Sequence, residues 1–423
     1  MKKRKLFEKL FFEKDNRKIS ILVGSRQVGK TTILKALYEH ICLNGNQKGL
    51  FLDLDLLANY EKVSTFENLT NTLRLNGFED AQKEFFYLFL DEFQRYKDLS
   101  LVMKNVYDAF DNVKVYASGS SSLQIKDSVQ ESLAGRKILT VLYPLDFKEF
   151  LWFKEEDAAL NELENAANLS GDRLVSVSKR LYDLLGEFMV FGGYPEVVLQ
   201  KENSSKIAVL ESIFDLYVRK DLVEYMQLDK VLDAKRLVEY LAVNNGQKIK
   251  FDEACSASSL NFTKLKQYIE ILKETYLISV IRPFFRNKNK EIVKIPKIYF
   301  LDSGVRNYFV NNFNPLHLRE DSGFLFEGYC LSELLKIGIR SDCLKFWQDK
   351  NKHEVDIVID NKQTQIPVEV KFKKTLKKED FIGIRSFGEA YKPKNSFIIN
   401  LGVQRKVDGI SVMLPYRLAL DLT

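Results

Sequence analysis

The sequence predicts an α/β protein whose N-terminal part is a doubly wound parallel sheet, and two patterns predict that fold class. Apolar runs of strand length, at residues 18–24, 49–56, 84–92 and 113–122, alternate with stretches whose apolar residues have helical spacing. Strands buried on both faces have such continuous apolar runs, and helices between them connect parallel neighbours. The first run also ends abruptly in a glycine-punctuated loop. A ligand is therefore expected at the carboxyl ends of the strands.

The first strand, this loop and the following helix form the stretch ILVGSRQVGKTT, from Ile21 to Thr32. The stretch fits the pattern G-x-x-x-x-G-K-[ST] without a mismatch, which a chance strand–loop–helix would seldom do. In such a loop, backbone N–H groups surround a phosphate chain, the lysine reaches the outer phosphates, and the next hydroxyl ligates Mg²⁺. The sequence thus predicts a site for ATP and Mg²⁺, with Thr31 as a metal ligand. The residues assigned to it are Gly24, Gln27, Val28, Gly29, Lys30, Thr31 and Thr32.

The strand FYLFLDE ends in two acidic residues, Asp91 and Glu92, as the partner strand of a phosphate loop should. We expect Asp91 to hold Mg²⁺ through its water shell and Glu92 to polarise the attacking water. One strand later, a hydroxyl at the tip of YASGSSS, from Ser118 or Ser120, is placed to sense the outer phosphate between the two acids. An ordinary Ser/Gly turn is the alternative for that segment.

Length and composition set wider bounds. The chain has 423 residues, 45% of them hydrophobic, which predicts two to four domains with sizeable cores. The net charge of +6 permits a nucleic-acid partner without requiring one. Four scattered cysteines argue against a disulfide framework or a structural zinc site. No apolar run is long enough for a membrane span or a signal peptide, so a soluble cytoplasmic protein without membrane contact is expected.

Three further regions follow the first sheet. Residues 151–227 have a helical pattern, interrupted by FGGYPEV at Phe191. Three more helices and two strand-like runs around the polar turn RNKNK predict a winged helix-turn-helix. After Phe324 a helix precedes three short strands. The predicted domains are residues 1–150, 151–230, 231–318 and 319–423.

The predicted wing is strongly basic. Its charged residues are Arg282, Arg286, Lys288, Lys290, Lys294 and Lys297 with one acid, Glu291, and the aromatic pair Phe284 and Phe285 flanks them. A basic wing suits contact with a DNA backbone, although such modules also dock proteins. The residues assigned to DNA are Arg282, Arg286, Lys288 and Lys290.

The C-terminal region contains a second group of charged residues. Asp356 lies in EVDIVID, and Glu369 and Lys371 form E-x-K in PVEVK, where alternation places both on one strand face. The intervening length suits a hairpin, and Glu327 lies on the preceding helix. Carboxylates with a lysine can hold Mg²⁺ against a phosphodiester. Glu327, Asp356, Glu369 and Lys371 are therefore a candidate second metal site that resembles the PD-(D/E)XK nuclease fold, or else ordinary surface charges on an edge hairpin. The basic run KFKKTLKK beside it would suit a phosphate backbone.

These features together resemble the AAA+ ATPases, and more narrowly a prokaryotic family of AAA+-like ATPases with a C-terminal domain of unknown function. The resemblance covers nearly the whole chain. Its markers are GSRQVGKTT, FLDEFQR, ASGSSS, SLAGRKILTVLYPLDFKEFL, FGGYPEVV, FLDSGVRNYF and EVDIVID followed by IPVEVK. In that family the C-terminal domain tends to carry the PD-(D/E)XK pattern.

The resemblance also implies roles for four further residues. Arg136 in LAGRK takes the place of an arginine finger, often supplied by a neighbouring subunit, or is a surface arginine in a turn. Gly193 and Pro195 match the G-x-P element of a helical lid over the nucleotide base. Arg219 in YVRKDL is a candidate second sensor, or part of a salt-bridged helix face.

Three functions fit the sequence. The first is an ATP-driven motor or remodeller that acts on DNA, in repair, recombination or a branch-migration-like role, as a homo-oligomer such as a hexameric ring. The second is a nucleotide-gated signalling switch with the winged helix as a protein dock. The third is an ATP-gated, Mg²⁺-dependent nuclease. DNA-stimulated ATP turnover would separate the first from the second, and metal-dependent cutting would single out the third.

Overall fold

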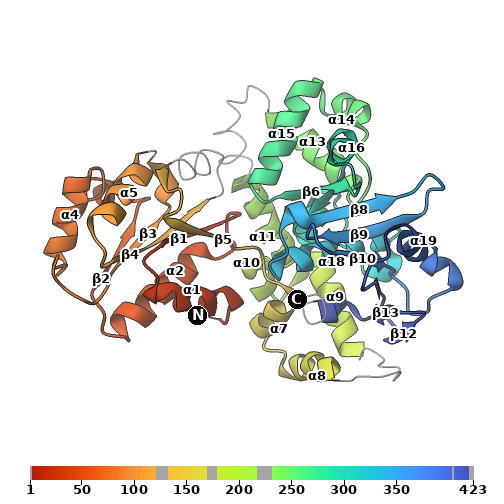
Figure 1. Cartoon of the computed structure of the whole chain (residues 1–423), viewed down its shortest axis with the longest axis horizontal. Helices are drawn as coiled ribbons and strands as arrows, with labels where there is room; N and C mark the ends of the chain where they lie inside the picture. The colour runs from red at the N-terminus through yellow and green to blue at the C-terminus, as the bar shows by residue number, and fades with distance from the viewer. Residues whose placement is uncertain are drawn as a thin grey trace. The chain divides into compact units, whose positions relative to one another are not determined.

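The computed structural model describes residues 2–96, 98–120, 132–168, 179–216, 231–402 and 404–418. The chain forms two units (Figure 1), residues 1–143 with 274–276, and residues 144–273 with 277–423. The predicted boundary at residue 150 lies near the end of the first unit, and those at 230 and 318 fall inside the second. In the parts that the structure describes, no helix combines the length and apolar character needed to cross a bilayer.

The first unit is built on a parallel five-stranded sheet in the order β2-β3-β4-β1-β5. Its strands are β1 (Ile19–Gly24), β2 (Gly49–Asp53), β3 (Phe86–Asp91), β4 (Val113–Ser120) and β5 (Lys137–Val141). The four apolar runs of the sequence form β1 to β4, so the predicted parallel α/β sheet is confirmed.

Helices cover both faces of this sheet (Figure 1). One face buries alternate residues of the central strands, among them Ile21, Leu88 and Val115, against α4 and α5. The opposite face carries α2, and α1 packs on α2. The helical segments are α1 (Lys5–Phe12), η1 (Glu13–Asp15), α2 (Lys30–Tyr38), η2 (Glu39–Leu43), α3 (Leu57–Tyr60), α4 (Phe66–Leu75), η3 (Phe93–Arg95) and α5 (Leu99–Ala109).

The second unit begins with helices, as the sequence predicts. The first group is α7 (Phe147–Lys154), α8 (Asp157–Asn168), α9 (Lys179–Phe191), α10 (Pro195–Leu199) and α11 (Asn203–Leu216). The second is α13 (Val231–Val243), α14 (Phe251–Ser258), α15 (Phe262–Glu274), α16 (Lys288–Val293) and α17 (Ser303–Phe309). The last is η5 (Leu316–Leu318), α18 (Ser322–Lys336), η6 (Ser341–Cys343), η7 (Lys378–Phe381), α19 (Ile382–Tyr391) and η8 (Pro415–Arg417).

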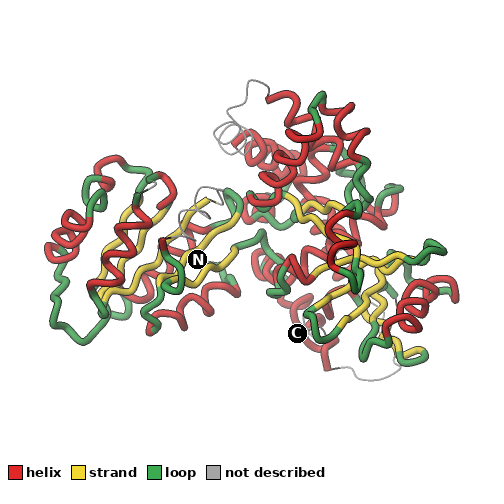
Figure 2. Tube along the Cα trace, turned by 45° about the horizontal axis from the view of Figure 1, so that its top comes forward, coloured by secondary structure: helices red, strands yellow, loops and turns green. Residues whose placement is uncertain are grey.

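One eight-stranded sheet runs through this unit in the order β12-β13-β11-β10-β9-β8-β6-β7. Figure 2 shows strands of this unit in yellow among red helices. Its strands are β6 (Ile278–Pro283), β7 (Lys297–Phe300), β8 (Leu344–Gln348), β9 (Glu354–Asp360), β10 (Gln365–Val370), β11 (Phe397–Ile399), β12 (Arg405–Val407) and β13 (Ile410–Met413). The pairing of β6 with β8 joins the hairpin predicted as a wing to the predicted C-terminal domain. The two regions therefore share one sheet.

The predicted wing differs from the structure in its connection. Strands β6 and β7 are antiparallel, but the segment RNKNK that was predicted as a turn leads into helix α16. Asn287 caps that helix by accepting a hydrogen bond from the amide of Asn289. The prediction for Lys297 as a surface cation is wrong, because its side chain is buried and paired with two carboxylates.

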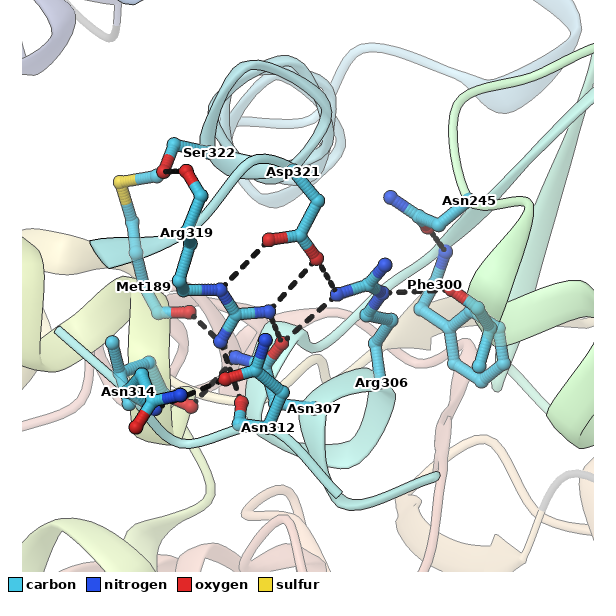
Figure 3. A network of polar contacts seen from close by, with 12 residues as sticks. Met189, Asn245, Phe300, Arg306, Asn307, Asn312, Asn314, Arg319, Asp321 and Ser322 are labelled. Carbon is cyan, nitrogen blue, oxygen red and sulfur yellow. Dashed lines mark hydrogen bonds and ion pairs between the residues drawn. The ribbon is translucent and has the colours of Figure 1, made fainter. Parts of the chain in front are cut away.

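A buried polar network positions the start of α18 (Figure 3). Asp321, directly before α18, accepts hydrogen bonds from the guanidinium groups of Arg306 and Arg319. Arg319 also donates to the side chain of Asn307 at 2.8 Å, and Arg306 to the carbonyl of Ala242 at 2.8 Å. Burial alone would raise the pKa of Asp321, but the hydrogen bonds from the two arginines lower it to about 2. Arg306 and Asn307, which belong to the segment FLDSGVRNYF, thus have a structural role in this network.

Asp321→Asn is expected to lower the free energy of unfolding by about 3 kcal/mol, because two buried guanidinium groups lose their carboxylate. The folded pKa of about 2 lies below the ordinary value of 3.8. This stabilisation is therefore complete above the unfolded pKa and is lost as the pH falls from about 4 to about 2. Urea unfolding at neutral pH and thermal unfolding through the acidic range measure the two effects.

The exposed pair of Arg340 and Asp342 offers a matched control, since both side chains are more than half exposed. Asp342→Asn should change the free energy of unfolding by less than about 1 kcal/mol. Equal losses in the two variants would show that the buried network does not stabilise the fold.

Candidate functional site

The phosphate-loop sequence forms a tight turn at the carboxyl end of β1. A Cβ on Gly24 would lie 2.1 Å from the carbonyl oxygen of Leu142, so only glycine fits beside the chain that leaves β5. Gln27 and Gly29 have left-handed backbone angles, with φ of 60° and 97°. Such angles are costly for a residue with a Cβ and natural for glycine. The loop therefore returns on itself directly before α2 begins at Lys30.

The side chain of Lys30 lies inside this turn. It is buried, and its Nζ donates to the carbonyl oxygens of Gly24 at 3.0 Å and Ser25 at 2.8 Å. Thr31 and Thr32 occupy the first turn of α2, half-buried and exposed respectively. The predicted nucleotide-binding residues are thus contiguous in space, with an ammonium group at the centre of the loop.

The acidic strand end lies beside the loop, because β3, β4 and β1 are neighbours in the sheet. Asp91 is buried at the end of β3 and accepts a hydrogen bond from the hydroxyl of Ser118 on β4. Glu92 follows in a left-handed conformation with φ of 56°, and its carboxylate accepts a hydrogen bond from the Gln94 amide. Ser120 pairs in register with Gly24. A carboxylate that holds a metal and one that orients water would suit these two positions.

Arg136 lies at the other end of the sheet. It precedes β5, and its carbonyl accepts a hydrogen bond from the amide of Ile19 at the start of β1. Its guanidinium forms a bidentate pair with Asp108, at 2.7 and 3.0 Å. Within one chain, Arg136 is therefore at the amino edge of the sheet and the phosphate loop at the carboxyl edge. A finger role requires a second copy of the chain.

The lid candidates Gly193 and Pro195 lie in the second unit, at the junction of α9 and α10. The amide of Gly193 donates to buried Asp302 at 2.7 Å, and a Cβ on Gly193 would lie 2.4 Å from the Leu145 carbonyl. A Cβ on Gly304 would likewise clash with the Phe191 carbonyl. The FGGYP and FLDSG segments therefore pack backbone against backbone, which requires glycine at Gly193 and Gly304. Arg219 lies outside the described residues.

The second unit gathers the C-terminal acidic residues and lysine around the antiparallel hairpin of β9 and β10. Lys371 Nζ lies 2.5 Å from Glu369 Oε1 and 3.8 Å from Asp356 Oδ2. The backbone amide of Val370 donates to Asp356 at 2.8 Å. The hairpin therefore holds one ammonium group between two carboxylates.

Three residues that the sequence analysis did not assign to this site complete it, namely Lys297, Tyr299 and Glu354, and they surround the predicted Glu327. Glu327 on α18 accepts hydrogen bonds from Lys297 at 3.1 Å and from the hydroxyl of Tyr299. Lys297 is also 2.5 Å from Glu354 on β9. Both Lys297 and Tyr299 come from β7, which is an edge strand of the eight-stranded sheet. The only signal in the sequence was a lysine within the otherwise apolar strand KIYF.

We call these residues the carboxylate centre: Lys297, Tyr299, Glu327, Glu354, Asp356, Glu369 and Lys371. Burial raises the pKa of Glu327 to about 7 and that of Glu369 well above its usual range. Burial alone would lower the pKa of Lys297, but the neighbouring carboxylates raise it well above its usual value. Two lysines thus balance much of the negative charge. Among the described residues, no three His, Cys, Asp or Glu side chains are arranged to hold a metal ion.

The four candidate DNA residues lie on different elements of the second unit. Arg282 and Arg286 are exposed, with the Arg286 guanidinium 5.2 Å from the centre of the Tyr391 ring. Lys288 and Lys290 belong to α16. Sequence analysis also missed an exposed polar surface on the first two turns of α15, formed by Thr263, Lys264, Lys266 and Gln267. In a helix-turn-helix this is the part of the second helix that reaches a DNA groove.

Comparison with known proteins defines the class of the first unit. Residues 16–151 match the family described as AAA domain, and residues 182–316 and 322–418 match two families described as domains of unknown function. An uncharacterized protein of Methanocaldococcus jannaschii is 25% identical over 401 residues, covering 91% of this chain and 81% of the relative. One from Haemophilus influenzae is 22% identical over 408 residues, covering 95% and 94%.

Solved structures also align with the chain. The Walker-type ATPase of Pyrococcus abyssi has a TM-score of 0.47 and 16% identity, over 73% of this chain and 96% of that one. The match of residues 16–151 and the phosphate loop within them define a P-loop, AAA+-like ATPase domain, and such a domain binds a nucleotide.

Proposed function

We propose that this protein hydrolyses ATP with Mg²⁺ and acts on DNA as an oligomeric motor or remodeller. The observation that carries the proposal is the arrangement at the carboxyl edge of the first sheet. There the buried ammonium of Lys30 lies inside the phosphate loop. Buried Asp91, at the end of β3, is hydrogen-bonded to buried Ser118, near the end of the neighbouring strand β4. This arrangement offers positive charge to a triphosphate and negative charge to a metal.

The residues divide the work of ATP hydrolysis. The loop amides, Lys30 and the first turn of α2 would bind the phosphates. Thr31 and Asp91 would hold Mg²⁺, which supplies charge neutralisation to the phosphate chain when bound. Glu92 would orient and polarise the attacking water, and Ser118 would link the two acidic positions to the γ-phosphate.

The position of Arg136 supports the proposed homo-oligomer, with Arg136 as its finger. A finger stabilises the charge that develops on the transferred phosphoryl group, so it must lie next to the γ-phosphate. Arg136 is on the amino edge of its own sheet and bound to Asp108. A neighbouring copy could present it after exchanging the Asp108 carboxylate for phosphate oxygens, as in a ring.

A nuclease activity is the second candidate, and one observation favours it. Oε2 of Glu369 is buried and has no hydrogen-bond partner, although a buried carboxylate oxygen normally has one. A metal ion at Asp356 and Glu369 would satisfy it and could activate water against a phosphodiester. The present contacts of Lys297 and Lys371 would then have to rearrange, because they hold the carboxylates.

The DNA contact is tested on the exposed start of α15. The double variant Lys264→Glu, Lys266→Glu should weaken duplex binding about equally across sequences, because phosphate contacts carry affinity without sequence information. The slope of log affinity against log salt should become shallower by roughly 0.9 for each lost phosphate contact. Arg286→Glu tests the wing in the same way. Fluorescence anisotropy at several salt concentrations measures both quantities.

Two controls accompany this titration. Lys406→Glu changes an exposed lysine on β12, at the opposite edge of the sheet from β7, and should leave affinity and slope unchanged. Asp356→Asn with Lys371→Met should also leave binding largely intact while it removes any Mg²⁺-dependent cutting. If the α15 and wing variants bind DNA like the wild type, the winged-helix region is a protein dock instead.

A further inference from the structure

The basic segment KKRK at the start of the chain contains a buried arginine. Arg4 directly precedes α1, and its side chain is only 5% exposed. One guanidinium nitrogen donates to the carbonyl oxygen of Val28 at 3.0 Å, and another donates to that of Tyr143 at 2.9 Å. Val28 is part of the phosphate loop, and Tyr143 is the last residue of the first unit before Pro144.

Both carbonyls lie where the phosphate loop meets the end of β5. Val28 lies between Gln27 and Gly29, the two residues with left-handed backbone angles. On the other side, the amide of Leu142 donates to the carbonyl of Val23 at 2.7 Å, and the carbonyl of Leu142 faces Gly24. The guanidinium therefore connects the inner end of the loop with the chain that leaves the unit.

We propose that Arg4 is a positioning residue of the nucleotide site, which holds the phosphate loop in its binding conformation and ties it to Tyr143. The inference rests on the nucleotide binding proposed for this loop. It extends the site to α1, because the matched AAA domain begins at residue 16.

An arginine suits this role better than a lysine would. Its planar group presents several N–H donors in a fixed fork, so two carbonyls can be held in one geometry. Removing it would leave two largely buried carbonyls without these donors, which is costly in a region of low polarity. The loop would then visit conformations that cannot surround phosphates.

The second carbonyl gives this contact a further consequence. The ring of Tyr143 packs edge-on against that of Tyr276, with centres 6.0 Å apart. Tyr276 follows closely on α15, the helix proposed to contact DNA. If the loop moves when a nucleotide binds, Arg4 would transmit that movement to the backbone of Tyr143 and to the packing of its ring against Tyr276.

The test compares ATP affinity and turnover in Arg4→Lys, Arg4→Ala and Leu10→Ala. Leu10→Ala is the matched control, because Leu10 is a buried apolar residue of α1 and does not belong to the phosphate loop. Fluorescent-nucleotide titration should show affinity about tenfold weaker in both Arg4 variants, on the scale of one lost charged hydrogen bond. The KM for ATP should rise with little change in kcat, because Asp91 and Glu92 are untouched. Leu10→Ala should lower the melting temperature at least as much as Arg4→Lys but keep its affinity.

Hydrogen exchange provides a second measurement that does not depend on turnover. Addition of a non-hydrolysable ATP analogue should slow exchange in residues 140–144 and 274–276 of the wild type, and less so in Arg4→Lys. Wild-type affinity in Arg4→Lys would overturn the inference, as would an equal loss of affinity in Leu10→Ala. Failure of the Arg4 inference can be told apart from failure of the proposed nucleotide site. If the nucleotide site itself were wrong, Lys30→Ala would bind ATP as the wild type does.

Discussion

Glu92→Gln is expected to bind ATP with nearly unchanged affinity and to hydrolyse it about 10²–10⁴-fold more slowly, the usual contribution of a positioned general base. The amide keeps the size of the side chain and a hydrogen-bonding oxygen, but it cannot accept a proton from water. Glu92 directly follows buried Asp91 at the end of β3, and its carboxylate accepts a hydrogen bond from the side-chain amide of nearby Gln94. The substitution should therefore leave the fold of the loop intact.

Phosphate release at saturating ATP and nucleotide titration measure the two halves of this prediction. Glu79→Gln is a suitable control, because Glu79 is an exposed glutamate of the same unit, paired with Lys48 at 2.9 Å. It should turn over ATP like the wild type. Near-normal turnover in Glu92→Gln would show that another group activates the water.

Lys30→Ala is expected to weaken ATP binding by about 100-fold or more, on the scale of two lost charge-assisted hydrogen bonds. The reason is its place inside the loop, where its ammonium already lies at hydrogen-bond distance from Gly24 and Ser25. When a triphosphate binds, these same donors can turn to the phosphate oxygens. No other cation among the assigned loop residues can supply that charge.

Thermal unfolding with and without ATP is a direct measurement, because a ligand that binds only the folded state raises its melting temperature. The wild type and Glu92→Gln should show this rise, and Lys30→Ala should not. Lys35→Ala, an exposed lysine one turn further along α2, should behave as the wild type does. A normal ATP-induced rise in Lys30→Ala would remove the phosphate-loop assignment.

The central strands of the first sheet could be predicted from the sequence because they are buried on both faces. Every residue of β1 and β3 is buried, as are residues 113–119 of β4, and the glycine-lysine pattern fixes the loop between β1 and α2. Strand β5 could not be recognised in the same way. It lies at the edge of the sheet, where Leu139 is 40% exposed and the strand has no continuous apolar pattern.

The carboxylate centre could be predicted only in part, for a different reason. Asp356, Glu369 and Lys371 are linked by the local geometry of one hairpin. Lys297 and Glu327 are thirty residues apart in the sequence, and only the continuous sheet with α18 packed on it brings them together. A buried lysine looks the same in sequence as an exposed one, because the carboxylates that compensate its charge lie elsewhere in the chain.

The same limit explains Arg4 and Arg136. The run KKRK has the composition of a solvated basic face, yet the structure buries one of its members against two carbonyls. The family resemblance gives Arg136 the position of a finger, but its pairing with Asp108 depends on how the end of α5 lies beside the start of β5. Side-chain partners that come from distant strands or helices require the assembled sheet.

The most direct test of the account is ATP turnover by the wild-type protein, measured with single-stranded, duplex and branched DNA and without DNA, with Glu92→Gln as the background. The account predicts Mg²⁺-dependent turnover well above that background and a further increase with at least one form of DNA. Turnover that never exceeds the Glu92→Gln background, or that is the same with every DNA and with none, would contradict a DNA-acting ATPase.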